Sequence, residues 1–317
     1  MFFSNQNLRN AGVVGLNRRN AEYTLRYNTR SLYPLVDDKL RTKRLAQEAG
    51  ITVPELYGAI EVPHQVRLLN SLVHSHDDFV LKPSSGSGGV GILVISGRTK
   101  KLYRRNDGVL VTEEEVKHHV LNILSGMYSL AGQPDKALIE YRVRFDPVFE
   151  AISYLGVPDI RIIVFLGVPV MAMVRLPTRM SGGRANLHQG AIGAGIDMAT
   201  GTTLTAVWRN EVVEEHPDTG NRVADVSIPR WRDLLTLGAR CYEMTGLGYQ
   251  GVDIVLDREK GPMILELNAR PGLAIQIANR TGLAPRLRFV EQCYRDLKTV
   301  EDRVGFAENR FAAVIRS

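Results

Sequence analysis

The feature that most constrains the fold is a glycine- and serine-rich stretch between two segments of β-strand character. Residues 79–91 read FVLKPSSGSGGVG and are followed by the β-branched segment ILVIS. Gly86, Gly88 and Gly91 match the dinucleotide-binding pattern GxGxxG, but that pattern requires a helix directly after the glycines. A P-loop requires a lysine at the end of the glycine loop, whereas Lys82 precedes it. The sequence therefore excludes both motifs at this position and predicts a β-hairpin.

A hairpin of this composition is suited to covering phosphate groups. The backbone N–H groups of a Gly/Ser turn can surround phosphate oxygens, and Lys82 adds a positive charge at the end of the incoming strand. A solvated surface loop is the alternative interpretation, and this stretch alone favours neither, because Gly/Ser-rich connectors are common. The candidate nucleotide-binding residues of the loop are Ser85, Gly86, Ser87, Gly88 and Gly89.

A second predicted hairpin brings oxygen-bearing side chains together. The apolar runs GVDIVLD and MILELN are joined by REKGP, whose glycine and proline are typical of a turn. We expect Leu256 to face Met263 across this turn. Asp253 then faces Glu266, and Asn268 lies on the same face as Glu266, because side chains in a strand alternate with a period of two.

Three such side chains at one place favour a metal site. Two opposed carboxylates repel each other unless a cation lies between them, and carboxylate and amide oxygens are ligands that Mg²⁺ prefers. A solvated acidic face is the alternative, but the flanking residues are densely apolar. We therefore predict Asp253, Glu266 and Asn268 as metal ligands. Arg270 follows them closely and is either a phosphate or carboxylate clamp or an ordinary surface arginine.

The composition excludes several classes of protein. The 317 residues carry a net charge of +6, but the basic residues are spread along the chain without a zinc-finger, RRM or basic-zipper pattern, so no nucleic-acid partner is expected. Cys241 and Cys293 cannot form a disulfide framework, which favours the reducing cytoplasm. The N-terminus lacks an apolar signal core, and the longest apolar run, residues 162–174, is shorter than the roughly 20 residues that span a bilayer. We expect a cytoplasmic protein without membrane insertion.

Predicted strands and helices alternate along the chain. A helix opens after Asp37 and Asp38 and ends at Gly50, and Thr112 with Glu115 forms a capping box for a helix that runs to about residue 126. The other predicted helices are 66–74, 229–245 and 285–298; the predicted strands are 51–60, 79–83, 92–96, 137–143, 159–167, 168–177, 251–257 and 263–268. Antiparallel hairpins mixed with helices indicate an α+β architecture.

The motifs, in their order along the chain, resemble one known superfamily. The segments DDKLRTKRLAQEAGITVP, FVLKPSSGSGGVG, LIEYRV, DIR, RANLHQG, GVDI and LELNARPGL resemble the ATP-grasp ligases, and among them the RimK-type α-L-glutamate ligases, over about residues 37–282. The resemblance implies two α+β subdomains that enclose ATP. They are expected at residues 37–137 and 138–317, after a short basic N-terminal arm, residues 1–36, in place of the full N-terminal domain of such ligases. Residues 142–158 are also longer than the equivalent stretch in RimK-type enzymes.

The resemblance implies a nucleotide-binding role for several residues. Lys39 and Lys82 match the two lysines that these enzymes direct at the ATP phosphates. Glu140 and Tyr141 match the hinge strand that holds adenine. Asp159, in the segment DIR, matches an acidic position that contacts the ribose.

The resemblance also implies a metal site and a phosphate-contacting loop. The hairpin residues Asp253, Glu266 and Asn268 match the family's magnesium ligands, with manganese as an alternative ion. Arg184 and Asn186, in RANLHQG, match the loop that contacts the terminal phosphates or an acyl phosphate. His188 lies in the same loop and is read as a hydrogen-bonding residue in preference to a base.

The reaction implied is the ATP-dependent joining of a carboxylate to an amine through an acyl phosphate, with release of ADP and phosphate. Lys82 is expected to neutralise phosphoryl charge, and Arg184 or Arg270 to stabilise the tetrahedral oxyanion. Glutamate or another amino acid is the expected acid, and an amino acid, peptide or protein the expected acceptor. The basic arm, with Arg18, Arg19, Arg26 and Arg30, is a candidate to hold an acidic acceptor or to complete a neighbouring subunit's site in a homo-oligomer.

Three alternatives stay open. The first is a non-catalytic ATP-binding regulatory protein, and the second is a ligase that acts on a sugar or other non-peptide amine. The third is an RNA- or ribosome-binding module that uses the basic N-terminus, which salt-dependent RNA binding without a nucleotide requirement would favour.

Overall fold

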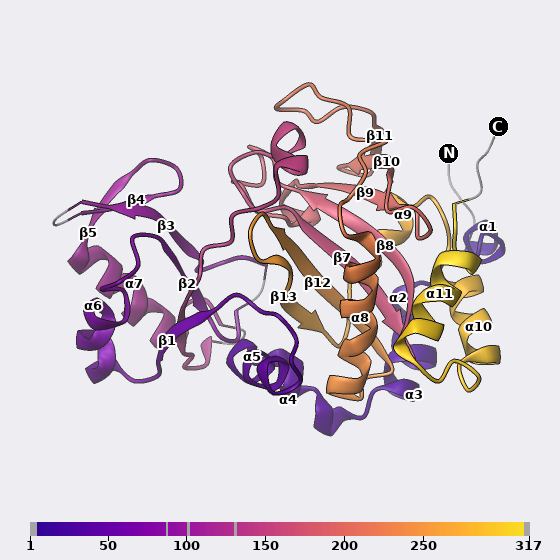
Figure 1. Ribbon diagram of the computed structural model, residues 1–317, viewed down its shortest axis with the longest axis horizontal. Helices are drawn as coiled ribbons and strands as arrows, with labels where there is room; N and C mark the ends of the chain where they lie inside the picture. The colour runs from indigo at the N-terminus through magenta and orange to yellow at the C-terminus, as the bar shows by residue number, and fades with distance from the viewer. Residues whose placement is uncertain (1–4, 87, 100–101, 130–131, 314–317) are drawn as a thin grey trace. The chain divides into compact units, whose positions relative to one another are not determined.

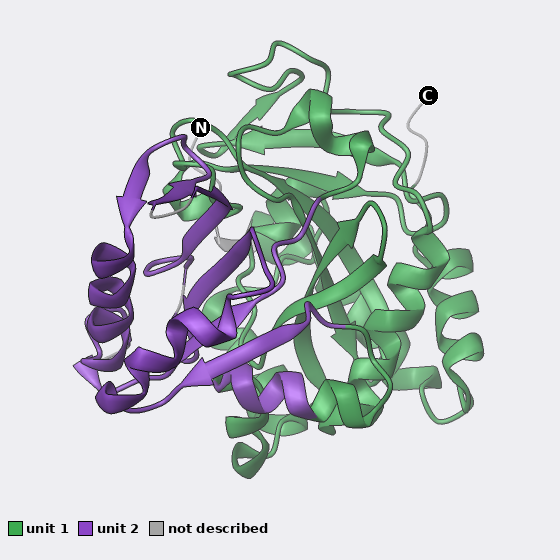
Figure 2. Cartoon of the chain, turned by 60° about the vertical axis from the view of Figure 1, so that its left-hand side comes forward, with its two compact units in different colours: residues 1–37, 45–52, 145–317 green, residues 38–44, 53–144 purple. Residues whose placement is uncertain are grey.

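The computed structural model describes residues 5–86, 88–99, 102–129 and 132–313. The chain forms two compact units (Figure 2). Unit 1 comprises Met1–Asp37, Leu45–Thr52 and Phe145–Ser317, and unit 2 comprises Asp38–Arg44 and Val53–Arg144. The N-terminal segment therefore belongs to unit 1, and the division falls within helix α5 (Lys39–Glu48).

Unit 2 is built on a six-stranded antiparallel sheet with the order β1-β6-β2-β3-β4-β5 (Figure 1). Its strands are β1 (Leu56–Ile60), β2 (Phe79–Pro83), β3 (Leu93–Arg98), β4 (Leu102–Arg105), β5 (Leu110–Thr112) and β6 (Ala137–Glu140). The glycine-rich loop joins β2 to β3, so the predicted hairpin is confirmed. Strand β6, which the sequence assigns to the second subdomain, lies in this sheet between β1 and β2.

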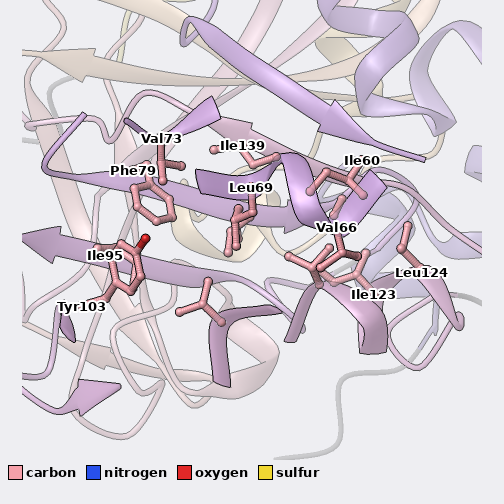
Figure 3. Packing of buried hydrophobic residues seen from close by; sticks show 14 residues of the cluster. Ile60, Val66, Leu69, Val73, Phe79, Ile95, Tyr103, Ile123, Leu124 and Ile139 are labelled. Atoms are coloured by element: carbon pink, nitrogen blue, oxygen red, sulfur yellow. The ribbon is translucent and has the colours of Figure 1, made fainter. Parts of the chain in front are cut away.

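Helix α7 (Glu113–Leu124) covers the core of unit 2. The predicted capping box is present, since Thr112 N donates to Glu115 Oε2 at 2.7 Å and Glu115 N to Thr112 Oγ1 at 3.2 Å. The predicted helix at 66–74 is instead a 3₁₀ turn, η3 (Pro63–Leu68), followed by the short helix α6 (Leu69–Leu72). Figure 3 shows the side chains of these elements packed against Phe79 and Ile95 of the sheet.

Unit 1 is built on a seven-stranded antiparallel sheet with the order β11-β10-β9-β8-β7-β12-β13 (Figure 1). Its strands are β7 (Asp159–Phe165), β8 (Val168–Leu176), β9 (Ile192–Ile196), β10 (Thr203–Trp208), β11 (Glu211–Val213), β12 (Tyr249–Asp257) and β13 (Gly261–Asn268). The apolar run at residues 162–174 is buried and divided between β7 and β8. Within the four described ranges, no helix is long and apolar enough to cross a membrane.

Helices pack against this sheet in unit 1. Helix α8 (Trp231–Thr245), close to its predicted bounds, packs against β7, β8, β12 and β13, while α9 (Ile275–Ala278) packs against β8, β9 and β10. The predicted C-terminal helix is α10 (Ala284–Cys293), which ends before its predicted bound. The sequence reading did not include α11 (Val300–Arg310), whose capping box pairs Thr299 with an aspartate, Asp302, at the position where glutamate is usual.

The basic N-terminal segment folds onto unit 1. Its helical turns are α1 (Asn5–Asn10), α2 (Leu16–Arg18), a π-helical turn η1 (Arg19–Thr24), α3 (Leu25–Tyr27), η2 (Arg30–Leu32) and α4 (Pro34–Asp37). Tyr23 is 2% exposed and meets the Phe165 ring edge-on at 5.7 Å. Asn28 donates to the carbonyl oxygens of Tyr249 and Ala269 at 2.7 and 3.0 Å. A few residues of the segment are therefore buried against the sheet of unit 1, which its weak periodicity did not reveal.

Candidate functional site

A cluster of two lysines and one glutamate is buried in unit 2. Glu140, the last residue of β6, receives Lys82 Nζ from β2 at 2.6 Å and Lys43 Nζ from α5 at 2.8 Å. All three side chains are at most 5% exposed. We call these residues the lysine cluster. It brings the predicted residues Lys82 and Glu140 together and adds Lys43, whose ammonium group also donates to Pro54 O.

The lysine cluster carries an excess of positive charge. Burial alone would raise the pKa of Glu140, but Lys82 and Lys43 outweigh it and the pKa is lowered, so the carboxylate is ionised. Burial lowers the pKa of Lys43, and the charge of Lys82 lowers it further, while Glu140 opposes both effects. With one carboxylate against two ammonium groups, the cluster is suited to attract an anion.

Lys39 and Lys43 are one helical turn apart, and the structure gives them different partners. Lys39 Nζ donates to Gly86 O at 2.6 Å, at the start of the glycine-rich loop. Lys43 points into the lysine cluster. The sequence reading chose Lys39 and missed Lys43, although the i, i+4 spacing in a helix places both side chains on one face.

The glycine-rich loop has a backbone that favours glycine. Gly88, Gly89 and Gly91 have φ angles of +65°, +75° and +79°. Ser85 N donates to the Asp135 carboxylate at 3.0 and 3.1 Å. Ser87, a predicted nucleotide-binding residue, lies outside the described residues.

The predicted adenine-holding residues follow each other at the end of β6. The Glu140 carboxylate is already bound by the two lysines of its cluster. Tyr141 N donates to Glu55 O at 2.8 Å, and the tyrosine side chain is buried. An adenine ring at this strand therefore remains a prediction.

In unit 1 the acidic hairpin forms with the predicted pairing of Asp253 and Glu266. The register differs near the turn, where Leu256 faces Pro262 instead of Met263. A β-bulge between Asp253 and Ile254 adds one residue on β13 and restores the predicted pairing beyond it.

Two arginines bind the carboxylate of Asp253. Arg161 Nε and Nη2 lie 2.7 and 2.6 Å from Asp253 Oδ1 and Oδ2. Arg175 Nη2 donates to Asp253 Oδ2 at 2.8 Å and to Asp159 Oδ2 at 2.6 Å, and its Nε also donates to Asp159. We call these four side chains, from β7, β8 and β12, the aspartate–arginine cluster. It is almost fully buried.

The strand register explains this cluster and shows what the sequence reading missed. Asp159 and Arg161 lie two residues apart on β7, so both point to one face of the sheet. Arg175 of β8 faces Asp159, and Asp253 of β12 faces Arg161. Asp159 was expected at the ribose, but its carboxylate is bound by Arg175. The sequence reading singled out Asp159 in the segment DIR. The alternation of side chains along a strand also places Arg161, two residues later, on the same face.

The two aspartates have opposite pKa shifts. Burial would raise the pKa of Asp253, but Arg161 and Arg175 outweigh it and bring the pKa to about 2. Burial raises the pKa of Asp159 to about 6, against the attraction of Arg175 and with the negative charge of Asp253 adding to the rise. Asp253 is therefore an anion at neutral pH. Asp159, with a pKa of about 6, titrates just below neutral pH.

The donor set at the hairpin fits a hard divalent cation. Asn268 Nδ2 lies 3.4 Å from Asp253 Oδ2, so the amide and the carboxylate are neighbours. Among the described contacts, Asp253 Oδ1 accepts only from Arg161 Nε, which leaves it a lone pair for a cation. In the described part of the chain no three His, Cys, Asp or Glu side chains gather as metal ligands. A site here would rest on two carboxylates and the Asn268 amide oxygen, a set typical of Mg²⁺.

The predicted phosphate-contacting loop follows β8 and is held by its own hydrogen bonds. Asn186 Oδ1 accepts from His188 N at 3.0 Å, and Thr178 Oγ1 donates to Gly190 O at 2.8 Å. The Arg184 side chain is exposed, and no acidic group of the described residues lies within ion-pair distance of it. The His188 side chain is also exposed. The loop therefore presents an exposed guanidinium.

Arg270 lies two residues after the end of β13, where the N-terminal segment holds the backbone. Its guanidinium is exposed and lies over the ring of Tyr33, 5.3 Å from the centroid. Arg19 Nη1 donates to the carbonyl oxygens of Arg270 and Pro271 at 3.2 and 2.8 Å. Arg19 belongs to the basic arm that the sequence reading proposed for an acidic acceptor, but it is 7% exposed and its guanidinium binds this backbone.

Comparison with known proteins identifies relatives. The model of the sugar-transfer associated ATP-grasp family matches residues 18–292. A protein of Stutzerimonas stutzeri named probable alpha-L-glutamate ligase is 23% identical over 240 residues, which cover 75% of this chain and 56% of that protein. The chain thus spans little more than half the length of this relative.

Among solved structures, ATP-grasp ligases have a similar fold, with low TM-scores. D-cycloserine synthetase DcsG has a TM-score of 0.45 at 14% identity and covers 84% of this chain and 72% of its own. The ATP-grasp ligase PsnB, complexed with a minimal precursor, has a TM-score of 0.44 at 14% identity and covers 85% and 63%.

Proposed function

Because the chain belongs to the sugar-transfer associated ATP-grasp family, we propose that it is an ATP- and magnesium-dependent carboxylate–amine ligase. It forms an amide bond through an acyl phosphate and releases ADP and phosphate. The observation that carries the proposal is the oxygen-donor face of Asp253, Glu266 and Asn268, backed by Arg161 and Arg175. A cation site beside two buried guanidinium groups is suited to the phosphates of a nucleotide.

Each unit supplies a distinct part of the nucleotide chemistry in this proposal. In unit 2, Lys82 and Lys43 bind phosphate oxygens, and Glu140 holds both ammonium groups in place beforehand. The backbone N–H groups of Gly86, Gly88 and Gly89 in the glycine-rich loop cover the phosphates, whereas the Ser85 N–H is bound to Asp135. Glu140 and Tyr141 mark the strand proposed for adenine, and Lys39 contributes through the loop carbonyl that it binds.

In unit 1, Asp253, Glu266 and Asn268 would hold magnesium, or manganese as the alternative ion. When bound, the ion supplies charge neutralisation on the phosphoryl oxygens. Arg161 and Arg175 hold the Asp253 carboxylate in place for that ion. We assign Asp159 the role of orienting Arg175 instead of contacting the ribose, because both of its carboxylate oxygens accept hydrogen bonds from that guanidinium.

The first step transfers the γ-phosphoryl group to the substrate carboxylate. A carboxylate oxygen forms a bond to the γ-phosphorus while the bond from that phosphorus to the bridging oxygen of ADP breaks. The lysine cluster holds the negative charge that accumulates on the nucleotide. Arg184, which is exposed and has Asn186 bracing its loop, contacts the transferred phosphoryl group.

The second step makes the amide. The amine nitrogen bonds to the acyl carbon, the C–O bond to phosphate then breaks, and the amine proton is lost to solvent or a base. Arg184 or Arg270 stabilises the oxyanion between these events, because both guanidinium groups are exposed and free of described acidic partners.

The relatives support two classes of substrate. The name of the Stutzerimonas stutzeri protein supports glutamate as one substrate. In our proposal the other substrate is an amino acid, a peptide or a protein. The family description, which associates it with sugar transfer, favours a second candidate, an amine carried by a sugar. Both candidates share the acyl-phosphate chemistry and differ only in the nucleophile.

The test is magnesium-dependent ADP release from ATP across a panel of acids and amines, including amino acids, peptides and amino sugars, with mass spectrometry of products. We expect one pair to raise ADP release and to yield a product lighter by one water than the sum of the pair. Lys82→Ala and Glu266→Ala should abolish the signal, whereas Lys117→Ala, at an exposed pair on α7, should not. ATP binding without turnover by any pair would contradict the ligase and favour a regulatory protein.

A further inference from the structure

The end of the glycine-rich loop is fastened to helix α7 by His119. The Nε2 atom of His119 lies 2.9 Å from Gly91 O, and the imidazole ring lies 5.4 Å from the ring of Tyr128. Because a carbonyl oxygen can only accept a hydrogen bond, the imidazole donates from Nε2. The side chain is partly buried, so this hydrogen bond is shielded from solvent.

The backbone passes so close to Tyr128 that only glycine fits at position 91. Gly91 has a φ of +79°, and a Cβ added there would lie 2.5 Å from Tyr128 Cγ. Neither the backbone conformation nor the space admits a side chain. The path of the loop at Gly91 is therefore set by two residues of one region, His119 and Tyr128.

The opposite end of the loop is held by other groups. Lys39 Nζ donates to Gly86 O at 2.6 Å, and Gly86 forms an antiparallel β-bridge with Ser129. Gly86 depends on α5 and on the segment after α7, whereas Gly91 depends on a side chain of α7 itself. Removing the His119 donor releases Gly91 and leaves the contacts of Gly86 in place.

The imidazole of His119 stays neutral at physiological pH. Burial lowers the pKa of His119, the charges of Arg105 and His118 lower it further, and the hydrogen bond to Gly91 opposes these effects. A neutral imidazole has one N–H group, and that group is committed to Gly91.

We propose that His119 is a positioning residue for the nucleotide, which acts by fixing Gly91 and with it the backbone N–H groups of the glycine-rich loop. This inference rests on the proposed ATP-dependent function. His119 itself touches no phosphate. Its loss should therefore weaken ATP binding more than it slows the chemical step.

The first experiment measures amide hydrogen exchange of residues 84–92 in the full chain without nucleotide. We expect His119→Ala to accelerate exchange in this segment by about tenfold. His119→Gln, whose side-chain amide can donate to Gly91 O, should restore the slow rate. His118→Ala is the matched control, because His118 is exposed on the same helix and should leave the rate unchanged.

Two results of this experiment overturn the proposal. One is an unchanged rate in His119→Ala, and the other is an equal acceleration throughout unit 2, which would indicate a general structural role. If His119→Ala does not fold, His119→Phe replaces it, because phenylalanine keeps a ring against Tyr128 and removes the donor.

The second experiment measures the affinity for ATP with magnesium by calorimetry, together with KM and kcat. We expect His119→Ala to weaken ATP binding by about tenfold, with kcat changed less than KM. His119→Gln and His118→Ala should stay within about twofold of the wild type. Faster loop exchange with unchanged ATP affinity overturns the positioning role. A wild-type protein that binds no ATP overturns the proposed function instead, and the exchange rates still decide whether His119 fixes the loop.

Discussion

The two buried ionic clusters of the molecule are built from similar side chains but differ in their balance of charge. The lysine cluster of unit 2 sets two ammonium groups against one carboxylate, and the aspartate–arginine cluster of unit 1 sets two guanidinium groups against two carboxylates. The first has a net positive charge when ionised, and the second is balanced. Lysine is a compact point charge, whereas arginine binds a carboxylate with two parallel hydrogen bonds.

The difference indicates a division of labour. An excess of positive charge that is already desolvated attracts phosphate oxygens directly. A balanced cluster has no such excess, and it gains one only when a cation joins Asp253, Glu266 and Asn268. The comparison predicts that unit 2 is poised for the nucleotide alone, whereas unit 1 depends on magnesium.

The largest expected effect is on stability in unit 2. Glu140→Ala leaves Lys43 and Lys82 buried without a carboxylate, so we expect a loss of about 3–5 kcal/mol in the free energy of unfolding, measured by urea titration. Glu150→Ala is the control, because the exposed pair of Glu150 with Arg258 should be worth less than about 1 kcal/mol. Equal losses of stability in the two variants would contradict the conclusion that the buried lysines of the cluster depend on Glu140.

The next effect is on magnesium-dependent activity in unit 1. Asp253→Asn removes a proposed metal ligand and the partner of Arg161, and we expect ADP release to fall by about 100-fold. Asp233→Asn, at an exposed pair on α8, should retain activity. Full activity of Asp253→Asn at ordinary magnesium concentration would contradict the role of the hairpin.

The smallest effect is a pH dependence of stability within the aspartate–arginine cluster. The pKa of Asp159 is raised from 3.8 to about 6, so its contribution to stability is present below pH of about 4 and is lost as the pH rises through about 6. Asp159→Asn stays neutral and avoids that loss. As the pH rises from about 4.5 to about 7.5, we expect the free energy of unfolding of the variant to increase by about 1–3 kcal/mol relative to that of the wild type, measured by urea titration.

Asp253 should behave in the opposite way. Its pKa is lowered to about 2, so its contribution is present above pH of about 4 and is lost as the pH falls through about 2. Asp77→Asn, at a highly exposed position, serves as a control for the substitution itself and should change the free energy of unfolding by less than about 1 kcal/mol. If the difference in the free energy of unfolding between Asp159→Asn and the wild type stays constant from pH of about 4.5 to about 7.5, the pKa of Asp159 is not raised. The contrast between the two aspartates would then be wrong.

The candidate site was predictable where local pattern sets geometry. Alternation along two strands and a turn placed Asp253 opposite Glu266, and the loop composition placed Lys82 before a hairpin. The pairing near the turn was wrong by one residue, because no sequence signal marked the β-bulge that restores the register. Lys43 was within reach of the same reasoning, since it lies one turn from Lys39.

The contacts that define the clusters depend on neighbours that are distant in the chain. Arg175 binds Asp253 because β7 lies between β8 and β12 in the sheet, and no motif states that order. Arg19 binds the backbone after β13 and Asn28 binds the first residue of β12, each across more than 200 residues of the chain. The sequence could not show these contacts, and it therefore predicted an arm.

By itself the sequence determined many of the helices and strands, the two hairpins and the family resemblance, because strand alternation, capping boxes and turn residues act over a few positions. The tertiary structure alone decided which charges are paired. Glu140 became the partner of Lys43 and Lys82, Asp159 the partner of Arg175, and His119 the fastening of Gly91. The physical reason is that burial and partner distance set the energy of a charge, and both arise only when sheet order brings distant segments together.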